Sequence, residues 1–251
     1  MTRGFPSFRW VRSFWRLLIL LFTSVQASLA FLLRSLRGPL TTSQRATWLH
    51  DSCALTLRRL GIQIGADGRF PARGLLVSNH LSYLDILVFS ALAPCVFVSK
   101  KEVRSWPLYG WLAKMAGTVF VDRSRSSDSQ QANAGMAKAL SEGCVVVLFP
   151  EGTSSDGTGL LRFHAALFES AVTLHELVTA ARISYSVEEG SVANDICYWG
   201  TMTFLPHAMR LMSLHGIRAH VSFAAEAQQF DDRKVAAQVT RETVLILGQR
   251  P

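Results

Sequence analysis

The sequence is poor in charge and lacks the compact motifs that would indicate a metal or nucleic-acid partner. Charged residues make up 18% of the 251 residues, below the roughly 25% usual in a soluble domain. The net charge of +8 would suit a polyanion, but no zinc-finger spacing or RNA-binding aromatic motif occurs. The cysteines Cys53, Cys95, Cys144 and Cys197 form no C-x-x-C pair, which favours a reducing compartment without disulfides or structural zinc. We therefore expect no nucleic-acid partner.

The sequence also lacks internal repeats and low-complexity tracts, and its length suits one α/β domain with a substantial core. Short, valine-rich apolar runs alternate with helical patterns, which predicts an α/β fold with a mixed, largely parallel sheet flanked by helices. We expect residues 1–43 to form a membrane-anchoring helical segment and residues 44–251 the α/β domain. Strands are expected at 62–64, 74–77, 96–99, 118–121, 144–149, 183–187 and 218–223, and helices at 44–60, 82–92, 107–115, 128–141 and 164–180.

The N-terminal segment contains an apolar run, Leu17–Leu33, that carries no charge over 17 residues. A spanning helix needs about 20 apolar residues, so the run is short for that purpose. Arginines flank both ends, and Trp10, Phe14 and Trp15 lie at its front edge, as in a helix at a lipid headgroup layer. We expect a monotopic anchor with its arginines on lipid phosphates. A single spanning helix and a cleaved signal peptide are the alternatives.

The sharpest local pattern is Asn79-His80 followed by Asp85, directly after a predicted buried strand. Ligand sites concentrate at such strand ends in α/β sheets. On one continuous helix, residues five apart would not face each other. They meet if His80 lies in the loop and Ser82 caps the helix, because Asp85 then lies in the first turn. A carboxylate on one ring nitrogen leaves the other nitrogen free to accept a proton. Alone, this pattern favours a structural histidine and a simple cap.

Two further strands end in residues suited to polar ligands. Pro150-Glu151-Gly152-Thr153 follows the clearest buried strand, where Gly152 permits close backbone approach and Glu151 can bind a hydroxyl. Gly117 and Phe120 precede Arg123, whose guanidinium suits bidentate phosphate binding. An ordinary turn and a solvated surface cation are the competing interpretations of these two segments.

In combination, the three segments resemble the PlsC-like glycerolipid acyltransferases, the lysophosphatidic acid acyltransferase family. The match is Asn79-His80 through Asp85, then Gly117, Phe120 and Arg123, then Phe149 through Thr153. They occur in the family's order and approximate spacing, within residues 70–190. The resemblance implies His80 as general base, Asp85 as its orienting partner, and the other two segments as binders of the acceptor's glycerol phosphate. It further implies no metal or dissociable cofactor, and a two-helix membrane-docking element.

The activity implied by the resemblance is O-acyl transfer from acyl-CoA or acyl-carrier protein to the free hydroxyl of lysophosphatidic acid, which makes phosphatidic acid. We expect it on the cytoplasmic face of the inner or plasma membrane.

One departure concerns Ser154-Ser155-Asp156, which stands where many members have arginine after Glu-Gly-Thr. Arg162 or Arg123 would then have to bind the phosphate. This form is similar to relatives that acylate lyso-ornithine lipid, which is the alternative acceptor. A catalytically silent lipid carrier is the alternative of another class.

Overall fold

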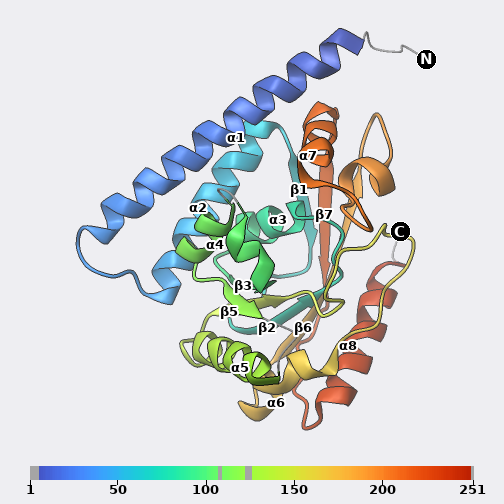
Figure 1. Cartoon of the computed structure of the whole chain (residues 1–251). Coiled ribbons are helices and arrows are strands. Elements are labelled where there is room, and N and C mark those ends of the chain that lie inside the picture. The colour runs from blue at the N-terminus through green and yellow to red at the C-terminus, as the bar shows by residue number, and fades with distance from the viewer. Residues whose placement is uncertain (1–5, 107–108, 122–125, 250–251) are drawn as a thin grey trace.

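The computed structural model describes residues 6–106, 109–121 and 126–249 around a central seven-stranded sheet (Figure 1). The strand order is β1-β7-β6-β2-β5-β3-β4. Neighbouring strands are parallel except for the antiparallel pair β6 and β7. The prediction of a mixed, largely parallel sheet is therefore confirmed. The strands are β1 (Gln63–Asp67), β2 (Gly74–Ser78), β3 (Val96–Lys100), β4 (Val119–Val121), β5 (Val145–Leu148), β6 (Val178–Ser186) and β7 (Arg218–Phe223).

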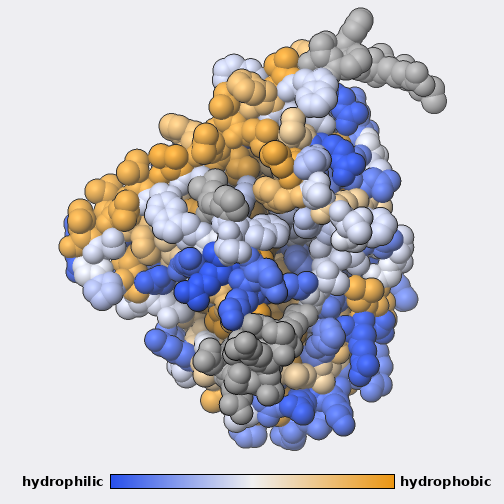
Figure 2. Space-filling model, in the orientation of Figure 1, coloured by the Kyte–Doolittle hydropathy of each residue, from blue (hydrophilic) through white to orange (hydrophobic). Residues whose placement is uncertain are grey.

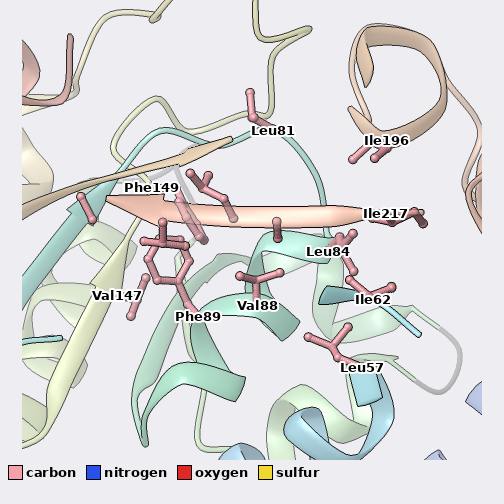
Figure 3. Close-up of a cluster of buried hydrophobic side chains, with 14 of the residues drawn as sticks. Leu57, Ile62, Leu81, Leu84, Val88, Phe89, Val147, Phe149, Ile196 and Ile217 are labelled. Carbon is pink, nitrogen blue, oxygen red and sulfur yellow. The ribbon is translucent and has the colours of Figure 1, made fainter. Parts of the chain in front are cut away.

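Helices cover both faces of the sheet, because the central strands are apolar on both sides. Successive side chains alternate between faces, so Leu76 and Val147 join one core cluster while Leu75 and Val146 join the other. The first cluster lies against α2, α3 and α7 (Figure 3) and the second against α5, α6 and α8. The helices are α2 (Thr42–Leu60), α3 (Leu84–Leu92), α4 (Tyr109–Met115), α5 (Ser126–Ser141), α6 (Glu169–Thr173), α7 (Phe204–Ser213) and α8 (Arg233–Leu247), with short 3-10 or π turns η1 (Lys101–Ser105), η2 (Ala165–Phe168) and η3 (Val192–Ile196).

The N-terminal helix α1 (Pro6–Ser35) lies lengthwise on the outside of the domain, against α2 and α7 (Figure 1). It is long and apolar enough to cross a bilayer by length and composition. Its inner side is held by polar contacts: Trp48 Nε1 donates to the Ala27 carbonyl at 2.8 Å, and Ser13 Oγ donates to the Met209 carbonyl at 2.9 Å. Its outer side carries exposed aromatic and aliphatic side chains, which form an apolar band over the helix (Figure 2).

The arginines at the start of α1 contact the protein. Arg12 Nη1 donates to the Ser213 carbonyl at 3.1 Å and Arg16 Nη1 to the Leu214 carbonyl at 2.5 Å, at the carboxyl end of α7. These carbonyls have no partner within the helix, so the guanidinium groups satisfy them and complement the helix dipole. The expectation that arginines at this end lie on lipid phosphates stays a prediction, because Arg12 and Arg16 each use one guanidinium nitrogen for these carbonyls. Arg3 lies outside the described residues.

Most predicted elements are present, but the helix predicted over residues 164–180 is wrong. The structure has η2 and α6 there, and β6 already begins at Val178. His175, with a φ of 52°, adopts the left-handed conformation and ends the helical part. Helices α7 and α8 were not predicted. The 107–115 prediction is met by α4 from Tyr109, and residues 107–108 lie outside the described part.

Candidate active site

The site lies where β2 and β5 end side by side. These strands are parallel, with Val77 opposite Leu148, so the segments that follow them leave the sheet at the same edge. Asn79-His80 follows β2, and Phe149 to Glu151 follows β5. The sheet therefore brings together two segments that are about seventy residues apart in the sequence.

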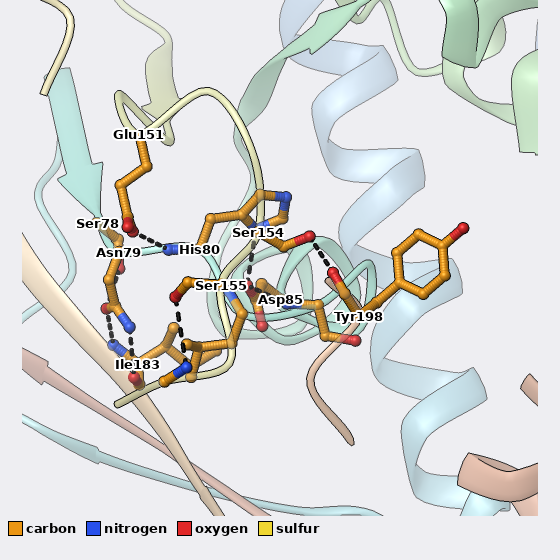
Figure 4. A network of polar contacts seen from close by, with 12 residues as sticks. Ser78, Asn79, His80, Asp85, Glu151, Ser154, Ser155, Ile183 and Tyr198 are labelled. Atoms are coloured by element: carbon orange, nitrogen blue, oxygen red, sulfur yellow. Dashed lines mark hydrogen bonds and ion pairs between the residues drawn. The ribbon is translucent and has the colours of Figure 1, made fainter. Parts of the chain in front are cut away.

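His80 and Asp85 are in direct contact, as the sequence predicted. His80 Nδ1 lies 2.8 Å from Asp85 Oδ2, and the aspartate is 0% exposed (Figure 4). An ionised carboxylate only accepts hydrogen bonds, so Nδ1 carries the proton and the lone pair remains on Nε2. The backbone amides of Leu81 and Ser82 donate to the same Oδ2, at 2.7 and 3.0 Å. The carboxylate thus holds the loop as well as the imidazole.

The predicted capping role of Ser82 is wrong. The helix is preceded by Tyr83, which makes no side-chain capping bond, and the buried Ser82 Oγ has no hydrogen-bond partner among the described residues. The other half of the expected capping pattern is present, because the Asp85 carboxylate reaches back and accepts from the Ser82 amide. Asp85 still lies in the first turn of α3, which is why it can face a loop residue five positions earlier.

A residue that the sequence analysis did not single out completes the aspartate's environment. Tyr185, on β6, donates its hydroxyl hydrogen to Asp85 Oδ1 at 2.6 Å. Burial, followed by the charge of Asp85, raises the pKa of Tyr185 well above its usual 10. Strand β6 reaches this point because it continues past the end of β2, where Asn79 replaces the strand ladder. The Asn79 side chain donates to the Ile183 carbonyl at 3.0 Å and accepts from its amide at 2.9 Å.

Glu151 is buried beneath the histidine loop, with 3% exposure. Its Oε1 accepts from the His80 amide and its Oε2 from the Leu161 amide, both at 2.8 Å. Burial raises the pKa of Glu151, while the two amide hydrogen bonds oppose that shift. Both oxygens are thus engaged with the backbone, an arrangement that fixes the loop and differs from the hydroxyl binding expected from the sequence.

The imidazole of His80 stacks on Phe149, with 4.3 Å between ring centroids and 12° between planes. Its side chain remains 20% exposed. Among the described residues no hydrogen bond reaches Nε2, which points away from the aspartate (Figure 4). A reacting hydroxyl can therefore approach the ring on this side.

The remaining predicted binding residues are spread over two places. Gly152 adopts a φ of 72° in the turn after β5, and Thr153 is exposed beside it. Gly117, with a φ of 76°, forms the turn between α4 and β4, and Phe120 lies on β4 at the edge of the sheet. Arg123 lies outside the described residues.

Two hollows lie near these segments. One, of about 260 Å³, is lined by Leu81, Tyr185, Asp156 and Arg182 among others, but not by His80. The other, of about 430 Å³, lies beside η1 and is lined by Lys101, Glu102, Arg104, Ser105 and Lys114. Three of the five residues around this second hollow are cationic, which suits an anionic group.

The loop from Ser154 to Asp156 adjoins the histidine loop. The Ser155 amide donates to the His80 carbonyl at 2.9 Å, and Ser154 Oγ donates to the Tyr198 carbonyl. Asp156 follows and is half-buried; hydrogen bonds from the backbone amide and hydroxyl of Thr158 hold its pKa below its usual value. A negative charge therefore lies one residue from the Ser155 contact with the histidine loop at neutral pH.

Comparisons with known proteins agree with this geometry. A family model described as Acyltransferase matches residues 62–186. The lyso-ornithine lipid O-acyltransferase of Pseudomonas aeruginosa is 36% identical over 81% of this chain and 79% of its own length. The 1-acyl-sn-glycerol-3-phosphate acyltransferase of Neisseria gonorrhoeae is 32% identical over 76% of each chain.

The fold has a match among solved structures. The crystal structure of the LPA acyltransferase PlsC from Thermotoga maritima covers 96% of this chain and 99% of its own, with a TM-score of 0.65 and 19% identity. That likeness shows the shared fold, while the 36% identical relative shows common family membership. The chain therefore belongs to the PlsC-like acyltransferase family and is an O-acyltransferase.

Proposed function

We propose that the chain transfers a fatty acyl group from an acyl thioester to the free hydroxyl of a lysolipid, with His80 as the general base. The observation that carries this proposal is the contact between His80 Nδ1 and the buried Asp85 carboxylate. It fixes the tautomer that leaves Nε2 basic, and it stabilises the imidazolium formed when Nε2 takes a proton.

The reaction follows from that tautomer. Nε2 removes the proton of the acceptor hydroxyl while the hydroxyl oxygen attacks the thioester carbonyl. A carbon–oxygen bond forms, the carbon–sulfur bond breaks, and the departing thiolate takes the proton from the imidazolium. No serine nucleophile is needed, because the acceptor supplies the hydroxyl. The donor is acyl-CoA or acyl-carrier protein, since both present the acyl group as a thioester.

Lysophosphatidic acid is the acceptor we propose first. The cationic side chains of Lys101, Arg104 and Lys114 surround the hollow beside η1, which can take a phosphate group. The N. gonorrhoeae relative is named for this acceptor. The predicted phosphate ligand Arg123 follows β4, the strand that pairs with β3 just before η1.

Lyso-ornithine lipid is the second candidate, and the position of Asp156 favours it. The carboxylate is ionised beside the histidine loop, where it suits a cationic headgroup and opposes a phosphate. The P. aeruginosa relative carries this name.

The test is a comparison of the two acceptors with one acyl donor, using purified protein and the variants His80→Ala, Lys114→Gln and Asp156→Asn. We expect His80→Ala to lose about 10²–10⁴-fold in kcat with either acceptor. With lysophosphatidic acid as substrate, Lys114→Gln should raise KM and Asp156→Asn should lower it. If Asp156→Asn instead raises the KM for lyso-ornithine lipid and leaves the KM for lysophosphatidic acid unchanged, lyso-ornithine lipid is the acceptor. Full turnover by His80→Ala would refute the mechanism.

We further propose that α1 lies in the plane of a membrane. Its 30 residues span about 45 Å, longer than the roughly 30 Å hydrocarbon core. A spanning orientation would separate α1 from α2 and α7, with which it makes polar contacts from Arg9 to Arg34. We place this membrane on the cytoplasmic side, because the four cysteines are free and buried.

A further inference from the structure

Tyr185 contacts the part of Asp85 that the histidine loop does not reach. We propose that Tyr185 is a positioning residue for acyl transfer, because its hydroxyl fixes the carboxylate that orients His80. This proposal rests on the proposed function of the His80 and Asp85 pair. The contact joins β6 to the first turn of α3, across 100 positions of sequence.

The two oxygens of Asp85 have unequal surroundings. Oδ2 accepts from His80 Nδ1 and from the amides of Leu81 and Ser82. Among the described residues, Tyr185 supplies the one donor to Oδ1. Asp85 is fully buried, so without Tyr185 this oxygen would be left unpaired in a dry environment. The carboxylate could then rotate, and the imidazole would lose its fixed orientation.

The tyrosine is held rigidly and always donates. Strand pairing with β7 fixes Tyr185 opposite Ala219, and the Asn79 bridge fixes Ile183 two residues earlier. Because its pKa lies well above 10, the phenol keeps its hydrogen throughout the neutral range. Tyr185 therefore differs from a second acid or base, since its charge does not change while the enzyme works.

The titratable groups around the pair come from several elements. Glu151 and Asp156 lie on the loop after β5, Tyr185 on β6, and Cys197 after η3, beside Asp85 itself. Burial raises the pKa of Cys197 to about 12, so its thiol stays neutral. Histidine is the side chain that ordinarily titrates near neutral pH. A shift in the acidic limb of the rate profile therefore reports on His80 and its partner.

The experiment compares wild type with Tyr185→Phe, in full pH profiles of kcat and kcat/KM. We expect kcat to fall about 10- to 100-fold, with KM for donor and acceptor within about twofold. The acidic limb should move to lower pH, because a carboxylate that has rotated away from Nδ1 stabilises the protonated imidazole less.

Tyr83→Phe is the matched control. Tyr83, like Tyr185, is a half-buried tyrosine, but its hydroxyl donates to Nδ1 of His207 at 3.0 Å. This variant should lose similar thermal stability while its acidic limb stays in place. In an Asp85→Asn background, Tyr185→Phe should cause no further loss, because the two residues act as a unit. Thermal unfolding midpoints separate loss of folding from loss of positioning.

The outcomes are distinguishable. If Tyr185→Phe is folded and keeps wild-type kcat and acidic limb while His80→Ala is inactive, the positioning role is refuted and the proposed function stands. Equal shifts of the acidic limb in Tyr83→Phe and Tyr185→Phe would also refute the role, because they would reflect general loosening. If His80→Ala retains full turnover, the proposed function itself fails.

Discussion

Glu151 shows how one buried carboxylate can hold together the two segments that form a site. Its two oxygens hold the amides of His80 and Leu161, so it joins the segment after β2 to the loop after β5. The amide of His80 lies next to the side chain that we propose as the base. A shift of this backbone would move Nε2 relative to the reacting hydroxyl, and such displacements cost rate steeply.

We predict that Glu151→Gln lowers kcat by about 10- to 100-fold and destabilises the fold by about 1–3 kcal/mol. Glutamine presents an NH2 group to one of two backbone N–H donors, which leaves a buried donor unpaired. Steady-state kinetics and chemical unfolding measure the two effects. The control is Glu169→Gln, which removes an exposed ion pair with Arg233 and should change neither by much. A wild-type kcat in a folded Glu151→Gln variant would contradict the prediction.

At this scale, the sequence predicted contacts within one segment and missed those between segments. The contact between His80 and Asp85 could be predicted because His80 follows a strand and Asp85, five residues later, lies in the first turn of the next helix. Tyr185 could not be found in the same way, because its neighbour is set by how far β6 runs past β2. Glu151 was identified as important, but its backbone partners depend on the pairing of β2 and β5.

At the scale of elements, α7 and α1 depend on each other. The last carbonyls of α7, at Met212, Ser213 and Leu214, accept from arginines of α1 instead of water. A helix end of this kind is normally satisfied by solvent or a cap. The contact therefore ties the apolar N-terminal helix to the catalytic domain.

We predict that Arg16→Met lowers the free energy of unfolding by about 1.5–3 kcal/mol, because a hydrogen bond from a charged group to partly buried carbonyls is lost. Methionine keeps much of the aliphatic packing. Hydrogen exchange should speed up at the carboxyl end of α7. Arg34→Met is the control, since Arg34 pairs with Asp51 on the surface and should contribute under about 1 kcal/mol. Equal losses of unfolding free energy in the two variants would show that the contact with α7 stabilises the fold no more than a surface ion pair does.

Elements with a strong local pattern were predicted well, and those decided by packing were not. Helix α2 is bounded by a capping box at Thr41 and a left-handed Gly61, both readable in the sequence. The segment 164–180 has apolar spacing suited to a helix, yet residues from Val178 pair with β2 and β7. Tertiary pairing on both sides of β6, with β2 and β7, overrides the local preference there.

At the scale of the whole molecule, the two sides of the domain differ in character. The apolar side chains of α1 form one continuous surface (Figure 2), while α8 lies on the other side of the sheet (Figure 1). An exposed apolar surface of this extent is typical of a membrane contact. The exposed residues include Trp10, Phe14, Trp15, Leu18, Leu21, Phe22, Val25, Leu29, Leu32 and Leu33.

The orientation of α1 can be measured with nitroxide labels on Phe14→Cys, Val25→Cys and Leu33→Cys, each exposed on its outer side. The native cysteines are buried, so labelling is selective. On vesicles containing anionic lipid, we predict that all three labels lie at one shallow depth, about 5–10 Å into the interface. A spanning helix would instead place Val25 near the bilayer centre and the other two near opposite surfaces. A label on Ile246→Cys, exposed on α8, should stay in water, because only the α1 side meets the lipid.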